Sequence, residues 1–312
     1  MGITYCYLPS LFLSHTAASD ARRATAGNFG LPGIVDLPTA RRFSDGELVV
    51  TQQLHKSLAR SGISFQALPR IGVSFRYTGH GINGGEAYGR VNHDRSFDAH
   101  ISILDEGIYT PAISLGLRDF IGTGWYSSEY ITGTKSIGNL ELTAGLGFGR
   151  LAGRNPFSNP LGALSSKFKQ RDGKSIGSGG TLGTINWFQG EASVFYGIQY
   201  QVTDKTTISL EHTADNMSLE SSYLNPKSPL NFAVSHQLND FVNLSAQYLH
   251  GNQVSVTAHV LVNPSRPPFL GGKELAPVPM RLRGEKASLL KTSDETKIRK
   301  VLAVDGFKIQ SL

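Results

Sequence analysis

The stretch from Ser193 to His212, SVFYGIQYQVTDKTTISLEH, alternates in polarity with a period of two residues. Every second residue from Val194 to Val202 is apolar, whereas Gln199, Gln201 and Thr203 fall on the other parity. This period predicts β-strands, and the short Thr-Asp-Lys break between the two runs predicts a hairpin. The apolar parity then contacts either the core of a soluble sandwich or lipid.

The composition of the 312-residue chain excludes several classes of protein. No apolar run is long enough for a membrane-spanning helix, so only a barrel could cross a bilayer. The net charge of +6 is mild, and the basic residues are scattered without interleaved aromatic residues, which indicates a solvated surface and no nucleic-acid partner. The single cysteine, Cys6, excludes an internal disulfide framework and a Cys-rich zinc site.

The chain between Gly46 and Asn263 contains about twelve candidate strands, with no helical periodicity between them. The predicted strands are residues 47–55, 62–68, 70–78, 95–104, 111–120, 126–135, 139–149, 193–203, 206–213, 230–238, 242–250 and 253–262. Every second connection is short, whereas residues 79–94, 150–192 and 214–229 form long loops. Short turns that alternate with long loops are typical of an antiparallel, up-and-down outer-membrane β-barrel.

Side-chain polarity fits the same architecture, because one parity of the strands is too polar for a second packed sheet. The candidate lumen-lining residues on that parity are Arg76, Asp98, His100, Arg118, Glu129, Glu141, Gln199, Gln201 and Glu211. Arg118 and Glu129 are expected to form an ion pair inside the barrel, where an unpaired charge is costly. The alternative is that these side chains line a path for an anionic or neutral glycan. A barrel of this size is either filled by side chains or leaves a narrow channel.

The segments that flank the barrel give the predicted domain organisation. Residues 1–21 resemble a secretory signal peptide without a basic start, and residues 22–45 form an N-terminal segment before the barrel of residues 46–263. Residues 264–284 are a Pro- and Gly-rich linker. Residues 285–312 predict one helix and one strand, which cannot bury a core alone, so we expect them to begin a periplasmic α/β segment that is cut short here.

No constellation of residues predicts catalysis, a metal or a cofactor. His80, His93 and His100 lack metal-ligand spacing. Ser127 and Ser128 lie beside Glu129 but lack the Gly-flanked elbow of a serine nucleophile. The loop GLPGIVDLP contains glycines but precedes no helix that could bind a phosphate.

Three stretches together resemble a known family. They are NFGLPGIVDLPTARRFSDGEL at residues 28–48, DEGIYTPAISLGLRDFIGTGWYSSEYITGTK at 105–135 and LTAGLGFGRL at 142–151. They resemble the YjbH (YbjH) family of exopolysaccharide-biosynthesis outer-membrane proteins, which is related to the capsule protein GfcD. The resemblance implies an outer-membrane barrel encoded with exopolysaccharide or capsule genes. Many members look like lipoproteins, but the residues before Cys6 are not a lipobox.

Three hypotheses follow for function. The first is a barrel in the cell outer membrane that contacts lipid and assists exopolysaccharide or capsule secretion or assembly, as pore or scaffold, with exopolysaccharide and other secretion proteins as partners. The second is an outer-membrane enzyme that modifies lipid or glycan, which would need a converging site. The third is a secreted soluble β protein, which would dissolve without detergent.

Overall fold

A computed structural model describes residues 23–81, 92–172, 181–182 and 186–264. The predicted signal peptide and nearly all of the predicted linker and α/β segment lie outside these residues. The described chain is dominated by long antiparallel strands. They are β1 (Leu48–His55), β2 (Leu58–Leu68), β3 (Ile71–His80), β4 (Asn92–Leu104), β5 (Ala112–Gly122), β6 (Ser128–Ile137), β7 (Leu140–Gly149), β9 (Ala192–Thr203), β10 (Thr206–His212), β11 (Leu230–Gln237), β12 (Val242–Leu249) and β13 (Gln253–Val262).

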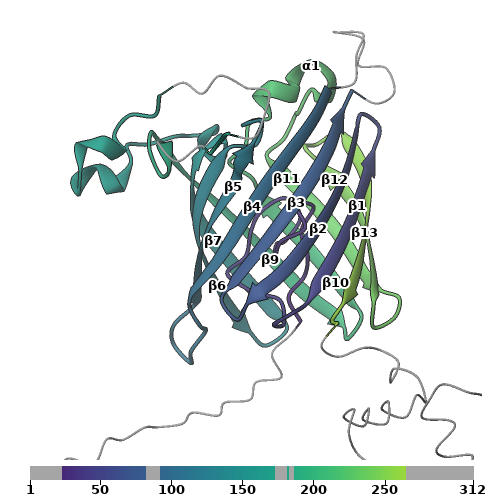
Figure 1. Cartoon of the computed structure of the whole chain (residues 1–312). Coiled ribbons are helices and arrows are strands. Elements are labelled where there is room, and N and C mark those ends of the chain that lie inside the picture. Colours follow the sequence, from purple (N-terminus) through teal and green to yellow (C-terminus); the bar gives the residue numbers. More distant parts are fainter. Residues whose placement is uncertain (1–22, 82–91, 173–180, 183–185, 265–312) are drawn as a thin grey trace, which may run out of the picture. The chain divides into compact units, whose positions relative to one another are not determined.

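These twelve strands close into a barrel, which Figure 1 shows from the side. Each strand pairs with its neighbour along the chain, and β1 pairs with β13 along its whole length, from Leu48 opposite Val262 to His55 opposite Ser255. A two-residue strand, β8 (Thr181–Leu182), pairs with the end of β5. The prediction of an all-β, antiparallel, up-and-down barrel is confirmed.

Two strands begin three or more residues earlier than predicted, and one of them is β4, which starts at Asn92 rather than at residue 95. The sequence predicted that the second strand starts at residue 62, but β2 starts at Leu58, directly after a tight turn. The added residues include Arg60, whose side chain is buried on the inner face of β2.

The two ends of the barrel differ in their connections. Short turns join the strands at one end, as at residues 69–70 and 204–205. The opposite end carries the long connections, which include the short helices η1 (Arg150–Ala152), η2 (Pro160–Ala163), η3 (Ser166–Phe168), η5 (Ser218–Glu220) and α1 (Ser221–Leu224). Figure 1 shows α1 above this long-loop end. The predicted asymmetry of the connections is therefore present in the fold.

The outer face of the barrel is apolar and the inner face is polar. On β9, Ile198 is 42% exposed, whereas the adjacent Gln199 is only 4% exposed. The same alternation continues around the wall, where Phe65, Phe75 and Val256 point outward. A closed sheet leaves no unpaired edge, and an apolar outer wall suits the hydrocarbon of a bilayer. In the described part of the chain, no helix is long and apolar enough to cross a membrane.

The orientation of β9 generates a prediction that uses two adjacent single-cysteine variants in a Cys6→Ser background. A fluorophore at Ile198→Cys should be strongly quenched by nitroxide-labelled lipid, because this side chain points outward. A fluorophore at Gln199→Cys should stay unquenched, because that side chain points into the barrel. Equal quenching at the two positions in correctly folded protein would show that the assigned faces of β9 are wrong.

Candidate functional site

The candidate site is the lumen, which is filled by the chain that precedes β1. Residues 23–47, called the plug here, form a compact set of loops inside the barrel, drawn in dark purple in Figure 1. Backbone hydrogen bonds hold the plug together, including Asn28 N to Val35 O at 2.7 Å and Gly33 N to Thr25 O at 3.0 Å. Gly30 has φ +84° and approaches the wall so closely that a Cβ atom would lie 2.6 Å from Ser64 Oγ.

A single carboxylate on the wall binds three successive backbone amides of the plug. Glu211 accepts hydrogen bonds from the N–H groups of Val35 at 3.0 Å, Asp36 at 2.9 Å and Leu37 at 3.0 Å. Asn231 donates to the same carboxylate at 2.8 Å. Converging backbone N–H groups form an anion-binding nest, and here the anion belongs to β10. The four donors compensate for the complete burial of the Glu211 side chain.

An aromatic ring of the plug lies among three guanidinium groups of the wall. The guanidinium carbons of Arg60, Arg76 and Arg118 lie 4.3, 4.5 and 3.9 Å from the centroid of the Phe29 ring. Tyr126 packs against the same ring edge-on, with centroids 5.5 Å apart. Cation–π contacts strengthen when water is excluded, so this cluster attaches the plug to three strands at once.

Each of the three arginines also has a polar partner. Arg76 forms a buried ion pair with Asp98 at 3.0 Å. Arg118 donates to the backbone carbonyl of Asp36 at 2.6 Å. Arg60 donates to Gln53 at 2.8 Å and lies 3.9 Å from the Asp36 carboxylate. The plug therefore supplies partners to two of the three arginines, the Asp36 carbonyl to Arg118 and the Asp36 carboxylate to Arg60, whereas Arg76 is paired within the wall.

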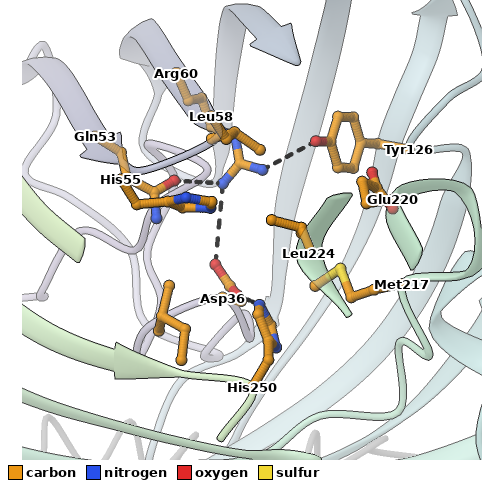
Figure 2. Close-up of a pocket in the computed structure, with 11 residues that line it drawn as sticks. Asp36, Gln53, His55, Leu58, Arg60, Tyr126, Met217, Glu220, Leu224 and His250 are labelled. Carbon is orange, nitrogen blue, oxygen red and sulfur yellow. Dashed lines mark hydrogen bonds and ion pairs between the residues drawn. The ribbon is translucent and has the colours of Figure 1, made fainter. Parts of the chain in front are cut away.

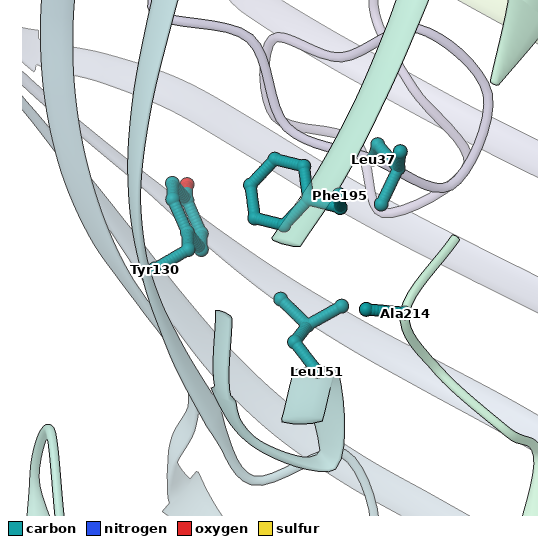
Figure 3. Close-up of a cluster of buried hydrophobic side chains, with 5 residues drawn as sticks. All are labelled: Leu37, Tyr130, Leu151, Phe195 and Ala214. Atoms are coloured by element: carbon teal, nitrogen blue, oxygen red, sulfur yellow. The ribbon is translucent and has the colours of Figure 1, made fainter. Parts of the chain in front are cut away.

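A small apolar cluster lies between the plug and the wall, as Figure 3 shows. It consists of Leu37, Tyr130, Leu151, Phe195 and Ala214. Two rings in it lie over strand glycines. A Cβ at Gly116 would lie 2.2 Å from the Tyr130 ring, and one at Gly145 would lie 2.3 Å from the Phe195 ring. Glycine in these strands thus marks places where an aromatic side chain covers the backbone.

Ion pairs also fix the plug at the short-turn end. Arg41 contacts Glu141 at 2.8 Å and Glu106 at 2.6 Å. Arg23, which pairs with Glu47 within the plug, donates to the Asp240 carbonyl of the β11–β12 turn at 2.7 Å. Burial alone would raise the pKa of Glu106, but hydrogen bonds from Lys135, the Ser136 amide and Arg41, together with the charge of Arg41, lower it below its ordinary value.

The described residues of the plug and the wall enclose a small cavity. This cavity, beneath α1, has a volume of about 20 Å³, and Figure 2 shows the residues that line it. Asp36 projects into it between Arg60, at 3.9 Å, and His250, at 3.8 Å. A cavity of this size holds about one water molecule. A sugar ring does not fit in it.

Most of the predicted lumen residues do lie on the inner face. Arg76, Asp98, His100, Arg118, Glu141, Gln199 and Glu211 point inward and are buried, and Gln201 shares their parity but is half-buried. The structure brings Arg76, Asp98 and Arg118 together around Phe29, whereas Glu141 and Gln201 lie near the short-turn end. His100 contacts the Tyr130 hydroxyl at 3.0 Å.

The prediction for Glu129 is wrong. Tyr130 points into the lumen, so Glu129 points outward, and it lies opposite Leu117 and Phe148 of the neighbouring strands. Its ion pair is with Arg171 of the β7–β9 loop at 2.6 Å, not with Arg118. The polar-inside rule fails here because a loop, rather than lipid, covers this end of the strand.

The serines and histidines considered as catalytic or metal-binding candidates lie at separate places in the fold. Ser128 points inward and Glu129 outward, so they do not share a site. His80 and His93 belong to paired strands rather than loops, and His93 stacks on Tyr77 at 5.3 Å. Among the residues that the structure describes, no group of three or more His, Cys, Asp or Glu residues could hold a metal ion.

The sequence did not predict the plug or its anchoring residues. Asn28, Phe29 and Asp36 lie in a stretch that reads as an irregular loop, and no periodicity marks it as buried. Asn28 nevertheless bonds to Asp36 at 2.9 Å, to Gln247 at 3.0 Å and to Thr257 at 2.8 Å. The polar parity of the strands could have indicated the plug. So many inward-facing polar side chains need hydrogen-bond partners that twelve strands cannot supply to one another.

Similar solved structures are outer-membrane barrels. A KdgM porin in complex with disordered oligogalacturonate has a TM-score of 0.37 and 11% identity, over 69% of this chain and 97% of that one. The COG4313 outer membrane channel from Pseudomonas putida F1 has a TM-score of 0.36 and 11% identity, over 73% of this chain and 99% of that one. Outer membrane phospholipase A from Escherichia coli has a TM-score of 0.30 and 11% identity, over 70% and 92%.

A curated relative, the "Uncharacterized lipoprotein YjbH" of Escherichia coli strain K12, is 28% identical over 255 residues. The alignment covers 78% of this chain but 36% of the relative, so the chain spans about a third of that protein's length. The family model "Exopolysaccharide biosynthesis protein YbjH" matches residues 25–312, which include the plug, the barrel and the residues that follow. With a closed barrel, an apolar outer wall and this match, the chain is an outer-membrane β-barrel protein that belongs to the YjbH family.

Proposed function

We propose that this protein assists exopolysaccharide secretion or assembly as a closed outer-membrane scaffold rather than as an open pore. The family description supports the link to exopolysaccharide. The observation that carries the choice of a scaffold is the filled lumen, in which Glu211 alone binds three plug amides. The plug residues that the structure describes lie where a polymer would have to pass, which supports a scaffold over a pore.

The contacts of the plug make opening energetically costly. Withdrawal of the plug would leave the Glu211 carboxylate without three of its donors and Arg118 without the Asp36 carbonyl. A buried charge that loses its partners is destabilised by several kcal/mol unless water replaces them. Opening would also separate Phe29 from its three arginines. The closed form is therefore the expected resting state, and a partner protein would have to supply the free energy for transport.

The plug gives a direct prediction for conductance. The whole chain in planar bilayers should be closed, whereas Glu211→Gln should show opening events. The substitution removes the charge that strengthens three hydrogen bonds, which should weaken retention of the plug by about 2–4 kcal/mol. Ser235→Ala is the matched control, because Ser235 lies on the inner face of β11 and bonds to Ser245. An unmodified chain that conducts steadily would contradict the scaffold proposal in favour of a pore.

A second prediction concerns the polymer itself. Deletion of the gene should reduce or alter polymer outside the cell, while cytoplasmic sugar precursors still form. Complementation with His100→Gln or Ser128→Ala should restore the polymer, because a scaffold needs no single reacting side chain.

Secreted polymer would be measured in each strain after barrel insertion has been checked by heat-modifiable mobility on gels. Full loss of polymer with one correctly inserted point variant would favour an enzyme that acts on lipid or glycan. Unchanged polymer in the deletion strain would remove the exopolysaccharide role.

A further inference from the structure

The described part of the β7–β9 loop from residue 157 onward forms short helices on the outside of the barrel. In Figure 1 its teal coils lie beside the barrel wall, near the end where α1 lies. Phe157 pairs with Ala192 through two backbone hydrogen bonds, of 2.8 and 3.0 Å. The Asn159 side chain caps η2 and donates to the carbonyls of Phe168 at 3.0 Å and Phe188 at 2.8 Å. These bonds tie residues 157–168 to residues 188–192.

The loop is attached to the outer wall by a buried ion pair. Arg171 donates two hydrogen bonds to the outward-facing Glu129, at 2.6 and 3.1 Å, and the Phe188 amide donates a third, at 3.0 Å. The Phe188 ring packs edge-on against Phe148, with centroids 5.5 Å apart, and Phe148 is fully buried although it points outward. The loop thus covers the wall where lipid would otherwise contact a carboxylate.

The part of the loop that points away from the wall combines exposed apolar and basic side chains. Leu164 is 80% exposed and Phe157 is 40% exposed, although hydrogen bonds fix the backbone on both sides of them. Lys167 and Lys169 are exposed, and neither forms an ion pair with a described residue. Of the five arginines and lysines in residues 150–172, three are engaged elsewhere, so Lys167 and Lys169 are the basic side chains of this surface.

We propose that this surface binds the outer leaflet of the membrane, with Leu164 at the boundary between acyl chains and headgroups and Lys167 and Lys169 on lipid phosphate groups. The long loops of outer-membrane barrels lie at the cell surface, which places this loop level with the outer headgroups. Apolar side chains flanked by basic ones are the pattern of interfacial membrane binding. The surface is continuous with the lipid-facing wall, because Arg171 and Phe188 lie directly on it.

The position of the loop favours lipid over a glycan. In Figure 1 the teal coils of the loop lie to the side of the barrel wall, level with its long-loop end. A soluble anionic glycan would use the lysines but would leave Leu164 in water. Lipid satisfies both features, because its phosphates match the lysines and its chains match the leucine. The inference is independent of the exopolysaccharide role, since it concerns how the barrel contacts its membrane.

The test uses the full chain in a Cys6→Ser background, with a fluorophore at Leu164→Cys. The protein is placed in mixed micelles, and phosphatidylglycerol is titrated in as the phosphate-bearing probe lipid. We expect a blue shift and quenching by shallow nitroxide lipid at Leu164→Cys, but not at Asn225→Cys, which is exposed at the same end above the lumen. Adding Lys167→Glu and Lys169→Glu should raise the half-maximal lipid concentration roughly tenfold or more.

The matched control carries the same change of charge at two other exposed lysines, Lys205→Glu and Lys227→Glu. It should leave the titration within about twofold of the unmodified chain, since both lysines lie outside the loop. If Leu164→Cys is not quenched, or if the two double variants behave alike, the proposal is wrong. A response to soluble anionic polysaccharide without a response to lipid would also overturn it and would assign the loop to glycan binding.

Discussion

The interaction on which the rest of the structure depends is the burial of the Glu211 carboxylate beneath three consecutive plug amides. A wall strand that presents a buried charge requires partners. The neighbouring β11 supplies the Asn231 side chain, but the sheet uses the backbone N–H groups of paired strands. The plug therefore stabilises the barrel, because it supplies hydrogen-bond donors to charged side chains that are buried on the inner face. The same reasoning applies to Arg118, whose hydrogen-bond acceptor is the carbonyl of Asp36, and to Arg60, which lies near the Asp36 carboxylate.

The shape of the plug also explains residues that look like poor strand formers. The β-strands contain glycine where the rings of Tyr130 and Phe195 lie against the backbone of the next strand. A Cβ at Gly116 or Gly145 would overlap those rings. These rings form the apolar cluster that contacts Leu37 of the plug. The glycines, the inward aromatic rings and the plug are thus one packing arrangement, in which each part fills space left by another.

The sequence predicted the barrel well because a wall between lipid and a polar interior imposes a period of two on every strand. It assigned the inward direction of residues such as Asp98 and Glu211 from polarity alone, and both are buried there. It failed for Glu129, because Arg171 of the β7–β9 loop pairs with this carboxylate on the outer face. The loop shields Glu129 from lipid, so the residue can point outward although it is charged. It also missed Phe29 and Asp36, because an irregular segment has no period that would reveal its burial.

Charges on the two faces of the wall are satisfied by the same kind of solution. Inside the barrel, the chain before β1 supplies amides to Glu211; outside it, the chain after β7 supplies Arg171 and the Phe188 amide to Glu129. In both cases a carboxylate on a strand fixes a segment that has little regular secondary structure of its own. An ion pair or a hydrogen-bonded carboxylate holds such a segment at a few residues only. The other side chains of the segment are therefore not committed to contacts with the sheet. For the outer segment, those side chains are Leu164 and the two lysines, which remain available for the membrane surface.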